Sequence, residues 1–133
     1  MAPVLNRIDH IHVYVPDRAA AEIWYREVLG LHRAPEFDSV ATPGGPLILS
    51  NPSGAIELAL FERPSQPCRS VIAFNVAAVE FLHWQSHLTG ALGQKPQAID
   101  HDLAWSLYFT DPYGNPYEIT SYDYKALAET LRP

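Results

Sequence analysis

Side chains that can bind metal ions or transfer protons occur in three short, mostly apolar segments of the sequence. They are His10 and His12 in IDHIHVYV, Glu57 in AIELALF and Glu118 in YEITSY. Imidazole and carboxylate groups are common protein ligands of divalent metal ions. The same groups act as general acids and bases near neutral pH. The pattern therefore indicates a metal site, an acid–base site, or both.

Alternation of polar and apolar residues predicts that these segments are β-strands, because successive side chains of a strand point to opposite faces. In the first segment one face is apolar, and the opposite face carries His10, His12 and Tyr14. By the same alternation, Glu57 and Glu118 lie on the polar faces of their strands. Buried carboxylates cost several kcal/mol unless they are paired. The two glutamates therefore require a partner, which is a divalent ion, a cationic substrate group or open water.

Each polar strand belongs to a longer unit that contains one predicted helix. The first helix is expected between Asp17, as N-cap, and Gly30, as the residue that ends it. The second helix lies in AVEFLHWQSHLTGAL and is expected to stop near Gly90. Helical spacing predicts that one stripe of the first helix is buried. That stripe consists of Ala20, Ile23, Trp24, Val28 and Leu31.

The chain contains two copies of one βαβββ-type unit. Matching residues are 60 or 61 positions apart from the first strand to the last. The pairs are Val15 with Val76, Trp24 with Trp84, Gly30 with Gly90 and Glu57 with Glu118. A separation this constant indicates a tandem duplication. We therefore predict an α+β fold with module one at about residues 7–62 and module two at about residues 69–124, forming a curved mixed β-sheet cup with the helices outside.

Length and composition exclude several classes of protein. The chain has 133 residues and a net charge of −6, which fits a single domain and argues against a surface that binds nucleic acid. No apolar run is long enough to span a bilayer, and we expect no membrane association. The single cysteine, Cys68, cannot form an internal disulfide, so a cytoplasmic location is expected.

Three stretches carry a family likeness, and together they span nearly the whole chain. They are DHIHVYVPD, WYREVLGL and YFTDPYGNPYEI. In these stretches the sequence resembles the vicinal oxygen chelate superfamily, which includes glyoxalase I, extradiol dioxygenases and bleomycin-resistance proteins. The resemblance implies paired βαβββ modules and, in most members, one divalent metal ion in the cup. It also implies a homodimer and a small-molecule substrate or ligand.

The resemblance also implies which residues hold the metal. Carried over position by position, the ligands are His10, Glu57 and Glu118, and the ion is Ni²⁺, Mn²⁺, Zn²⁺ or Fe²⁺. The remaining ligand position is usually a histidine, and here it is Val71. His12 lies two residues from His10 on the same strand face. It is either an additional ligand or a residue that contacts the substrate.

A histidine shortly before the last hairpin is a further catalytic candidate. The resemblance places His101 near the pocket, where it acts as a general acid or base together with Glu118. The alternative is a surface loop histidine beside two aspartates. The residues expected to bind substrate are His12, Tyr14, Trp105, Tyr108 and Tyr122.

Two functional hypotheses follow from these residues. The first is a metal-dependent enzyme of the glyoxalase or dioxygenase type, which holds a small substrate through vicinal oxygens for lyase, isomerase or dioxygenase chemistry. The second is a metal-free protein of the bleomycin-resistance type that binds or sequesters a small molecule. Val71 favours the second hypothesis because it removes one expected ligand.

Overall fold

The chain folds into two compact units, each with one four-stranded sheet. In the computed structural model, which describes residues 1–132, the units are Met1–Gln66 and Pro67–Pro133. Both combine helices with a mixed sheet, so the predicted α+β class and the two tandem βαβββ modules are confirmed. The union of the modules into one domain stays a prediction. No helix in residues 1–132 has the length and apolar character needed to cross a bilayer.

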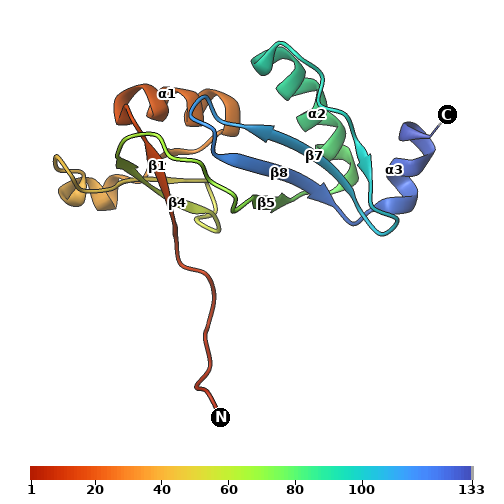
Figure 1. The fold of residues 1–133 in the computed structure, drawn as a ribbon. Coiled ribbons are helices and arrows are strands. Elements are labelled where there is room, and N and C mark those ends of the chain that lie inside the picture. Colours follow the sequence, from red (N-terminus) through yellow and green to blue (C-terminus); the bar gives the residue numbers. More distant parts are fainter. Residues whose placement is uncertain (133) are drawn as a thin grey trace. The chain divides into compact units, whose positions relative to one another are not determined.

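The first unit, module one, has the strand order β1-β4-β3-β2 (Figure 1). Its β1 and β4 are parallel, and the other neighbours are antiparallel. Residues 1–10 precede the first strand as an extended segment. The elements are β1 (Ile11–Val15), α1 (Arg18–Leu29), β2 (His32–Arg33), the 3-10 helix η1 (Pro35–Val40), β3 (Leu47–Ser50) and β4 (Glu57–Glu62).

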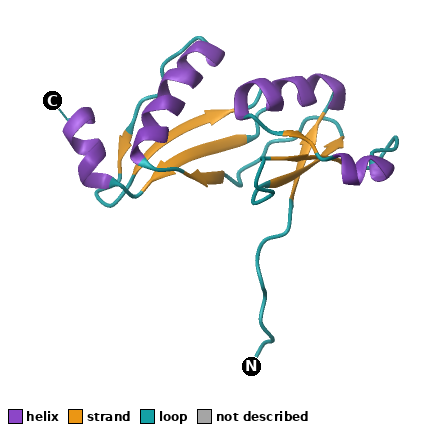
Figure 2. Ribbon diagram, turned by 180° about the vertical axis from the view of Figure 1, so that it is seen from behind, coloured by secondary structure: helices purple, strands orange, loops and turns teal. Residues whose placement is uncertain are grey.

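The second unit, module two, repeats this topology with the order β5-β8-β7-β6. Its β5 and β8 are parallel, and α2 packs against β8 (Figure 2). A C-terminal helix, α3, follows the repeated unit and was not predicted from the sequence. The elements are β5 (Ile72–Asn75), α2 (Ala78–Leu92), β6 (Ile99–Asp100), β7 (Trp105–Thr110), β8 (Pro116–Ser121) and α3 (Tyr124–Leu131).

Helix α1 begins and ends at the predicted residues, but its buried face differs from the predicted stripe. Asp17 Oδ1 accepts a hydrogen bond from the amide of Ala20, and Gly30 ends the helix with a φ of 69°. The buried residues of the helix are Ala21, Tyr25, Val28 and Leu29. The expected Ile23 is 50% exposed. Of the predicted stripe, Val28 and Leu31 are buried, Trp24 is half-buried and Ala20 is exposed.

Helix α2 spans the predicted segment and ends two residues past Gly90, close to the predicted stop. The helix ends at Leu92, and Gly93 takes the left-handed conformation with a φ of 74°. The amide of Gly93 donates to the carbonyl of Thr89. Because a left-handed residue ends a helix at low cost only when it lacks a Cβ, Gly93 is the counterpart of Gly30.

The hairpin turns that precede the glutamates differ between the modules. In module one the amide of Asn51 donates to the carbonyl of Ile56, which leaves residues 52–55 as the loop. In module two the amide of Asp111 donates to the carbonyl of Asn115, which leaves residues 112–114. The turn of module two is therefore one residue shorter. Its sequence also has one residue more between the turn glycine and the glutamate.

The two differences add, and they move the second glutamate two residues along its strand. Glu57 lies opposite Ser50, the last residue of β3. Glu118 lies opposite Tyr108, whereas Thr110, the last residue of β7, faces Pro116. The two glutamates match in sequence but occupy different rows of their sheets. The row of Glu118 corresponds to that of Ala59 in module one, which lies beside His12.

The Asp111 carboxylate holds the turn that sets this register. It is 3% exposed, and its Oδ1 accepts hydrogen bonds from the amides of Tyr113 (2.9 Å) and Asn115 (2.8 Å). Its Oδ2 accepts from Asn115 Nδ2 at 2.7 Å. The turn therefore depends on one buried acceptor group.

Replacement of Asp111 by alanine should lower the free energy of unfolding by ~1–3 kcal/mol, because buried amides lose their acceptor. Asp111→Asn keeps one oxygen for the backbone amides, as Asn51 does in module one, and should cost less. Urea denaturation of both variants checks this. Equal losses in the two variants would show that the hydrogen bonds to the turn amides do not stabilise the fold.

Candidate functional site

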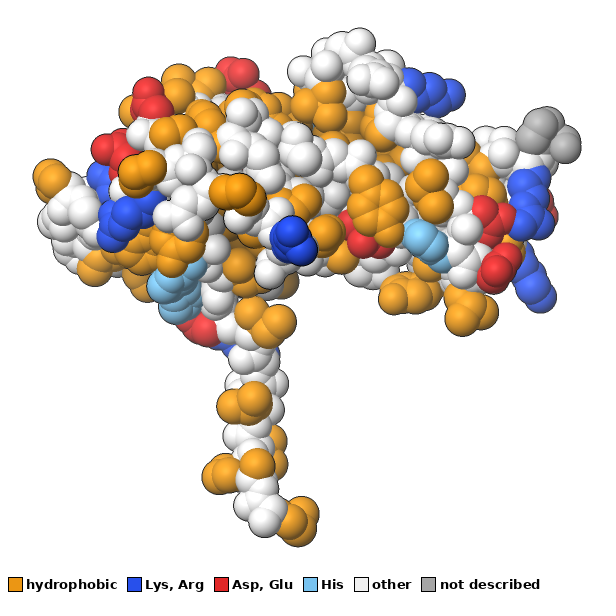
Figure 3. All heavy atoms as spheres, in the orientation of Figure 1, with side chains coloured by type: hydrophobic (Ala, Val, Ile, Leu, Met, Phe, Trp, Pro, Cys, Tyr) orange, Lys and Arg blue, Asp and Glu red, His pale blue; other side chains and the backbone are white. Residues whose placement is uncertain are grey.

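Two histidines form a close pair on the polar side of β1. His10 Nε2 lies 3.2 Å from His12 Nε2, and the two rings stack with their centroids 5.1 Å apart. The His12 ring also lies 4.7 Å from the ring of Phe61 on β4. Both histidines are exposed. Figure 3 shows histidine side chains gathered on the surface where the extended N-terminal segment meets the folded module.

Asp9 orients the first histidine of this pair. Its Oδ2 lies 2.8 Å from His10 Nδ1, and its Oδ1 accepts from the Arg7 guanidinium at 3.3 Å. The hydrogen bond from His10 holds the pKa of the Asp9 carboxyl below its ordinary value, and the charge of Arg7 acts in the same direction. In neutral His10 this bond requires the proton on Nδ1, so Nε2 presents its lone pair to His12. The position of Asp9 directly before His10 is the sequence signal for this role, which was not predicted.

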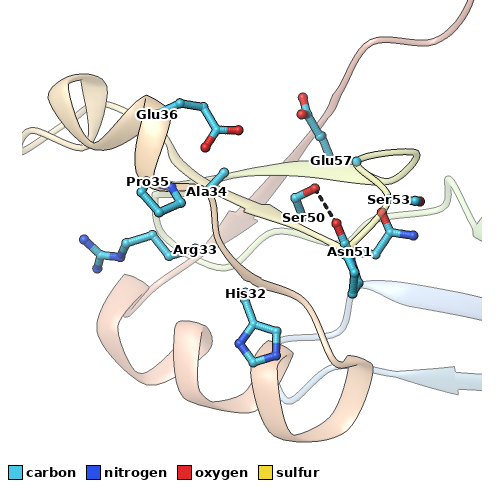
Figure 4. Close-up of a pocket in the computed structure, with 11 residues that line it drawn as sticks. His32, Arg33, Ala34, Pro35, Glu36, Ser50, Asn51, Ser53 and Glu57 are labelled. Carbon is cyan, nitrogen blue, oxygen red and sulfur yellow. Dashed lines mark hydrogen bonds between the residues drawn. The ribbon is translucent and has the colours of Figure 1, made fainter.

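Glu57 lines a pocket of module one with a volume of about 500 Å³. The side chains of Glu57 and Glu36 project toward the same side of the pocket (Figure 4). Ser50 also lines this pocket. His32 also lines the pocket but points to its other side. Sequence reasoning assigned no site role to Glu36 or His32, because β2 and η1 lie in the irregular stretch between the helix and the next strand.

Glu118 is held by a serine on the neighbouring strand. Ser106 Oγ donates to Glu118 Oε2 at 2.6 Å and lies 3.2 Å from Thr120 Oγ1. Ser106 is fully buried, whereas Glu118 is partly exposed. A hydrogen bond to a carboxylate stabilises its ionised form and restricts its rotamers. The Ser106 hydrogen bond therefore holds the Glu118 side chain in one orientation at the sheet surface.

His101 and Tyr108 form a hydrogen-bonded pair on the same face of module two. His101 Nε2 lies 2.9 Å from the Tyr108 hydroxyl, and Tyr108 is the direct cross-strand neighbour of Glu118. The turn that carries His101 closes with a hydrogen bond from its amide to the carbonyl of Ala104. Asp102 in this turn has a φ of 67°, a conformation that aspartate adopts more easily than most residues.

The remaining predicted site residues lie in different environments. Tyr14 and Tyr122 are exposed, and the Tyr14 ring lies 6.0 Å from that of Phe61. Trp105 lies on the opposite face of β7 from Tyr108 and is 4% exposed. Its Nε1 donates to the carbonyl of Tyr124, which favours a packing role. Val71 precedes β5 and is 47% exposed.

The structure gathers the predicted residues into two separate groups, one in each module. Module one brings His10 and His12 together, and module two brings His101, Tyr108 and Glu118 together. Within residues 1–132 no three His, Cys, Asp or Glu side chains cluster in an arrangement that could hold a metal ion. Within the described residues, each module by itself therefore offers at most two such side chains close enough to share a metal ion.

Both modules match one known protein superfamily. The model of the glyoxalase/bleomycin resistance protein/dioxygenase superfamily matches residues 7–119. The chain belongs to this superfamily. The matched region covers both modules, so the predicted resemblance to vicinal oxygen chelate proteins is confirmed. A search of curated protein sequences found no similar sequence.

Solved structures of this superfamily share the fold. A putative glyoxalase family protein from Bacillus anthracis is 23% identical with a TM-score of 0.69, covering 92% of this chain and 100% of the other. The fosfomycin resistance protein FosX from Listeria monocytogenes, solved with Mn(II) and sulfate, is 13% identical with a TM-score of 0.69. That alignment covers 97% of this chain and 100% of FosX. At these identities the likeness establishes the fold.

The turn that carries His101 is anchored by Asp100. Its carboxylate accepts from the amide of Asp102 at 2.9 Å, from the Tyr124 hydroxyl at 2.8 Å and from Arg132. These bonds, led by that of Asp102, lower the pKa of Asp100, and the Asp100 acceptor raises the pKa of Tyr124. Any stability that Asp100 contributes is present above its ordinary pKa of 3.8 and is lost as the pH falls through the lowered value.

Asp100→Asn should lower the pKa of Tyr124 toward its ordinary value of 10.0, since the substitution removes the largest cause of the increase. NMR titration of the tyrosine ring carbons measures this shift. Asp123→Asn is the matched control, because Asp123 accepts from the amide of Ala78 and does not bind the Tyr124 hydroxyl. An unchanged Tyr124 pKa in Asp100→Asn would contradict the described hydrogen bond.

Proposed function

We propose that this protein is a metal-dependent enzyme of the superfamily that acts on a small substrate with two neighbouring oxygens. The observation that carries the proposal is His10, whose Nδ1 is bound by Asp9 and whose Nε2 faces His12 Nε2 at 3.2 Å. Metal-binding histidines in proteins almost always donate their other ring N–H in this way. Membership of the superfamily and the FosX structure with Mn(II) agree with this proposal.

The proposed ligands are His10, Glu57 and Glu118, binding one Ni²⁺, Mn²⁺, Zn²⁺ or Fe²⁺ ion. A divalent ion bound there would act as a Lewis acid on the substrate oxygens. Ser106 keeps Glu118 in one orientation, which favours its use as a ligand or base. The donor types in this set suit all four metals.

Proton transfer is proposed for the polar group of module two. Tyr108 lies between His101, with which it shares a hydrogen bond, and Glu118, its neighbour across the strands. A proton taken from the substrate by Glu118 would therefore have a tyrosine–histidine pair close to it. Tyr14 and Tyr122 are exposed side chains proposed to contact the substrate, and a homodimer is proposed as the assembled form.

A metal-free binding protein is the second candidate, and Val71 favours it. Val71 occupies the position at which the resemblance implies a histidine, and its exposed side chain cannot ligate a metal. Under this alternative the exposed tyrosines would contact an organic ligand. Thermal shift separates the candidates, because a ligand stabilises the state to which it binds. Metal ions raise the melting temperature under the first proposal, and only organic ligands raise it under the second.

Purified protein, made without a histidine tag, should retain about one divalent ion per chain. Glu118→Gln should lower this content strongly, because a neutral amide is a weaker ligand than a carboxylate. Elemental analysis measures the content, and Glu129→Gln on exposed α3 is the matched control. The proposal fails if the wild-type protein holds no metal and binds none after addition of Ni²⁺, Mn²⁺, Zn²⁺ or Fe²⁺.

A further inference from the structure

We propose that His12 is a second imidazole ligand of the metal and takes the place of the histidine that Val71 lacks. This inference rests on the proposed function and assigns both imidazoles to module one. The first strand segment of module two, residues 71–76, contains no histidine. An imidazole pair at the start of β1 is therefore the arrangement that restores two nitrogen ligands.

The distance between the two ring nitrogens fits a shared metal ion. Two Zn–N bonds of ~2.0–2.1 Å that meet at an angle between octahedral and tetrahedral place the nitrogens ~2.9–3.4 Å apart. His10 Nε2 and His12 Nε2 are 3.2 Å apart. The separation of the two nitrogens therefore already matches that of two ligands of one ion. The accessible surface of both histidines leaves room for the ion to enter.

The hydrogen bond from His10 to Asp9 determines how the pair is protonated. With its proton on Nδ1, His10 offers a lone pair at Nε2, and neutral His12 then completes the contact by donating from its own Nε2–H. Metal binding at both Nε2 atoms requires the proton of His12 to move to its Nδ1. The proton stays on the ring, so the total charge of the pair does not change. Two different tautomers of His12 therefore distinguish the metal-free and metal-bound states.

Neighbouring side chains hold the His12 ring in place for this role. It stacks on His10 with an interplanar angle of 22° and contacts the Phe61 ring, which itself packs against the buried Ala34, Ile48 and Ala59. A ligand whose rotamer is fixed by packing loses little entropy when the metal binds.

The strand registers give an independent reason to choose His12. His12 lies beside Ala59 on β4, and the corresponding pair in module two is Ala73 beside Glu118. His12 and Glu118 therefore occupy corresponding rows of the two sheets. Glu57 lies two residues closer to its hairpin turn and corresponds to Pro116. His12 therefore matches the row of Glu118 in the sheet, and Glu57 does not.

The ligand chemistry of the pair predicts metal preference. Imidazole suits Zn²⁺, Ni²⁺ and Fe²⁺, whereas sites of carboxylate and water suit Mn²⁺ and Mg²⁺. With two imidazoles, the protein should bind Ni²⁺ and Zn²⁺ in strong preference to Mn²⁺. Loss of His12 should reduce the affinity for Ni²⁺ by a larger factor than the affinity for Mn²⁺.

NMR of the ¹⁵N-labelled wild-type protein, through long-range ¹H–¹⁵N correlations of the histidine rings, tests the tautomers. Without metal, His10 should carry its proton on Nδ1 and His12 on Nε2. Addition of Zn²⁺ should shift the Nε2 signals of both rings and move the His12 proton to Nδ1. In calorimetric titrations His12→Ala should weaken Zn²⁺ binding by more than the ~10–100-fold that loss of an orienting group such as Asp9 costs.

His83→Ala is the matched control, because His83 is an exposed histidine on α2. It should leave Zn²⁺ affinity unchanged. If Zn²⁺ binds but the His12 signals do not move, or His12→Ala binds as tightly as wild type, the role of His12 is overturned and the metal-dependent function stands. If no metal binds the wild-type protein, the proposed function fails as well. The NMR result on wild type keeps the test decisive even if His12→Ala does not fold.

Discussion

The pairing of the last strand with its two neighbours determines where the chemistry of each module can lie. In both modules this strand runs parallel to the first strand and antiparallel to the strand before the turn. Since its register is locked on both sides, the hairpin turn sets the row of every side chain that follows. The carboxylate of Asp111 closes a turn with three loop residues, whereas the corresponding turn at Asn51 has four. Together with one additional residue between the turn glycine and the glutamate, this difference carries Glu118 two residues further into its sheet than Glu57.

The polar groups of both modules are arranged by neighbours that satisfy one of their hydrogen-bonding atoms. Asp9 binds one nitrogen of His10, Ser106 binds one oxygen of Glu118, and Tyr108 binds one nitrogen of His101. In each case the hydrogen bond to one atom restricts the rotamers of the side chain, so less conformational entropy is lost when a ligand binds. Such preorganisation is what a binding or catalytic group requires. The same arrangement explains why partly exposed side chains keep defined positions.

Duplication followed by divergence explains the asymmetry of the two halves. The folding features are retained, including a glycine that ends each helix in the left-handed conformation and a tight turn before each last strand. The polar face has diverged, with histidines at positions 10 and 12 and Val71 and Ala73 at the corresponding positions. Module one has become the source of imidazole, and module two the source of the fixed carboxylate with a tyrosine–histidine pair.

The sequence by itself determined the α+β class, the two modules, the N-cap Asp17 and the faces of the polar strands, because these depend on periodicity and on local backbone preferences. It misplaced part of the buried face of α1, since burial depends on what packs against the helix. It also equated Glu57 with Glu118. Only the tertiary structure decided their rows, the approach of His10 to His12, and the partners Asp9 and Ser106. Those contacts depend on turn length and strand register, and pairing across strands is not visible in the order of residues along one strand.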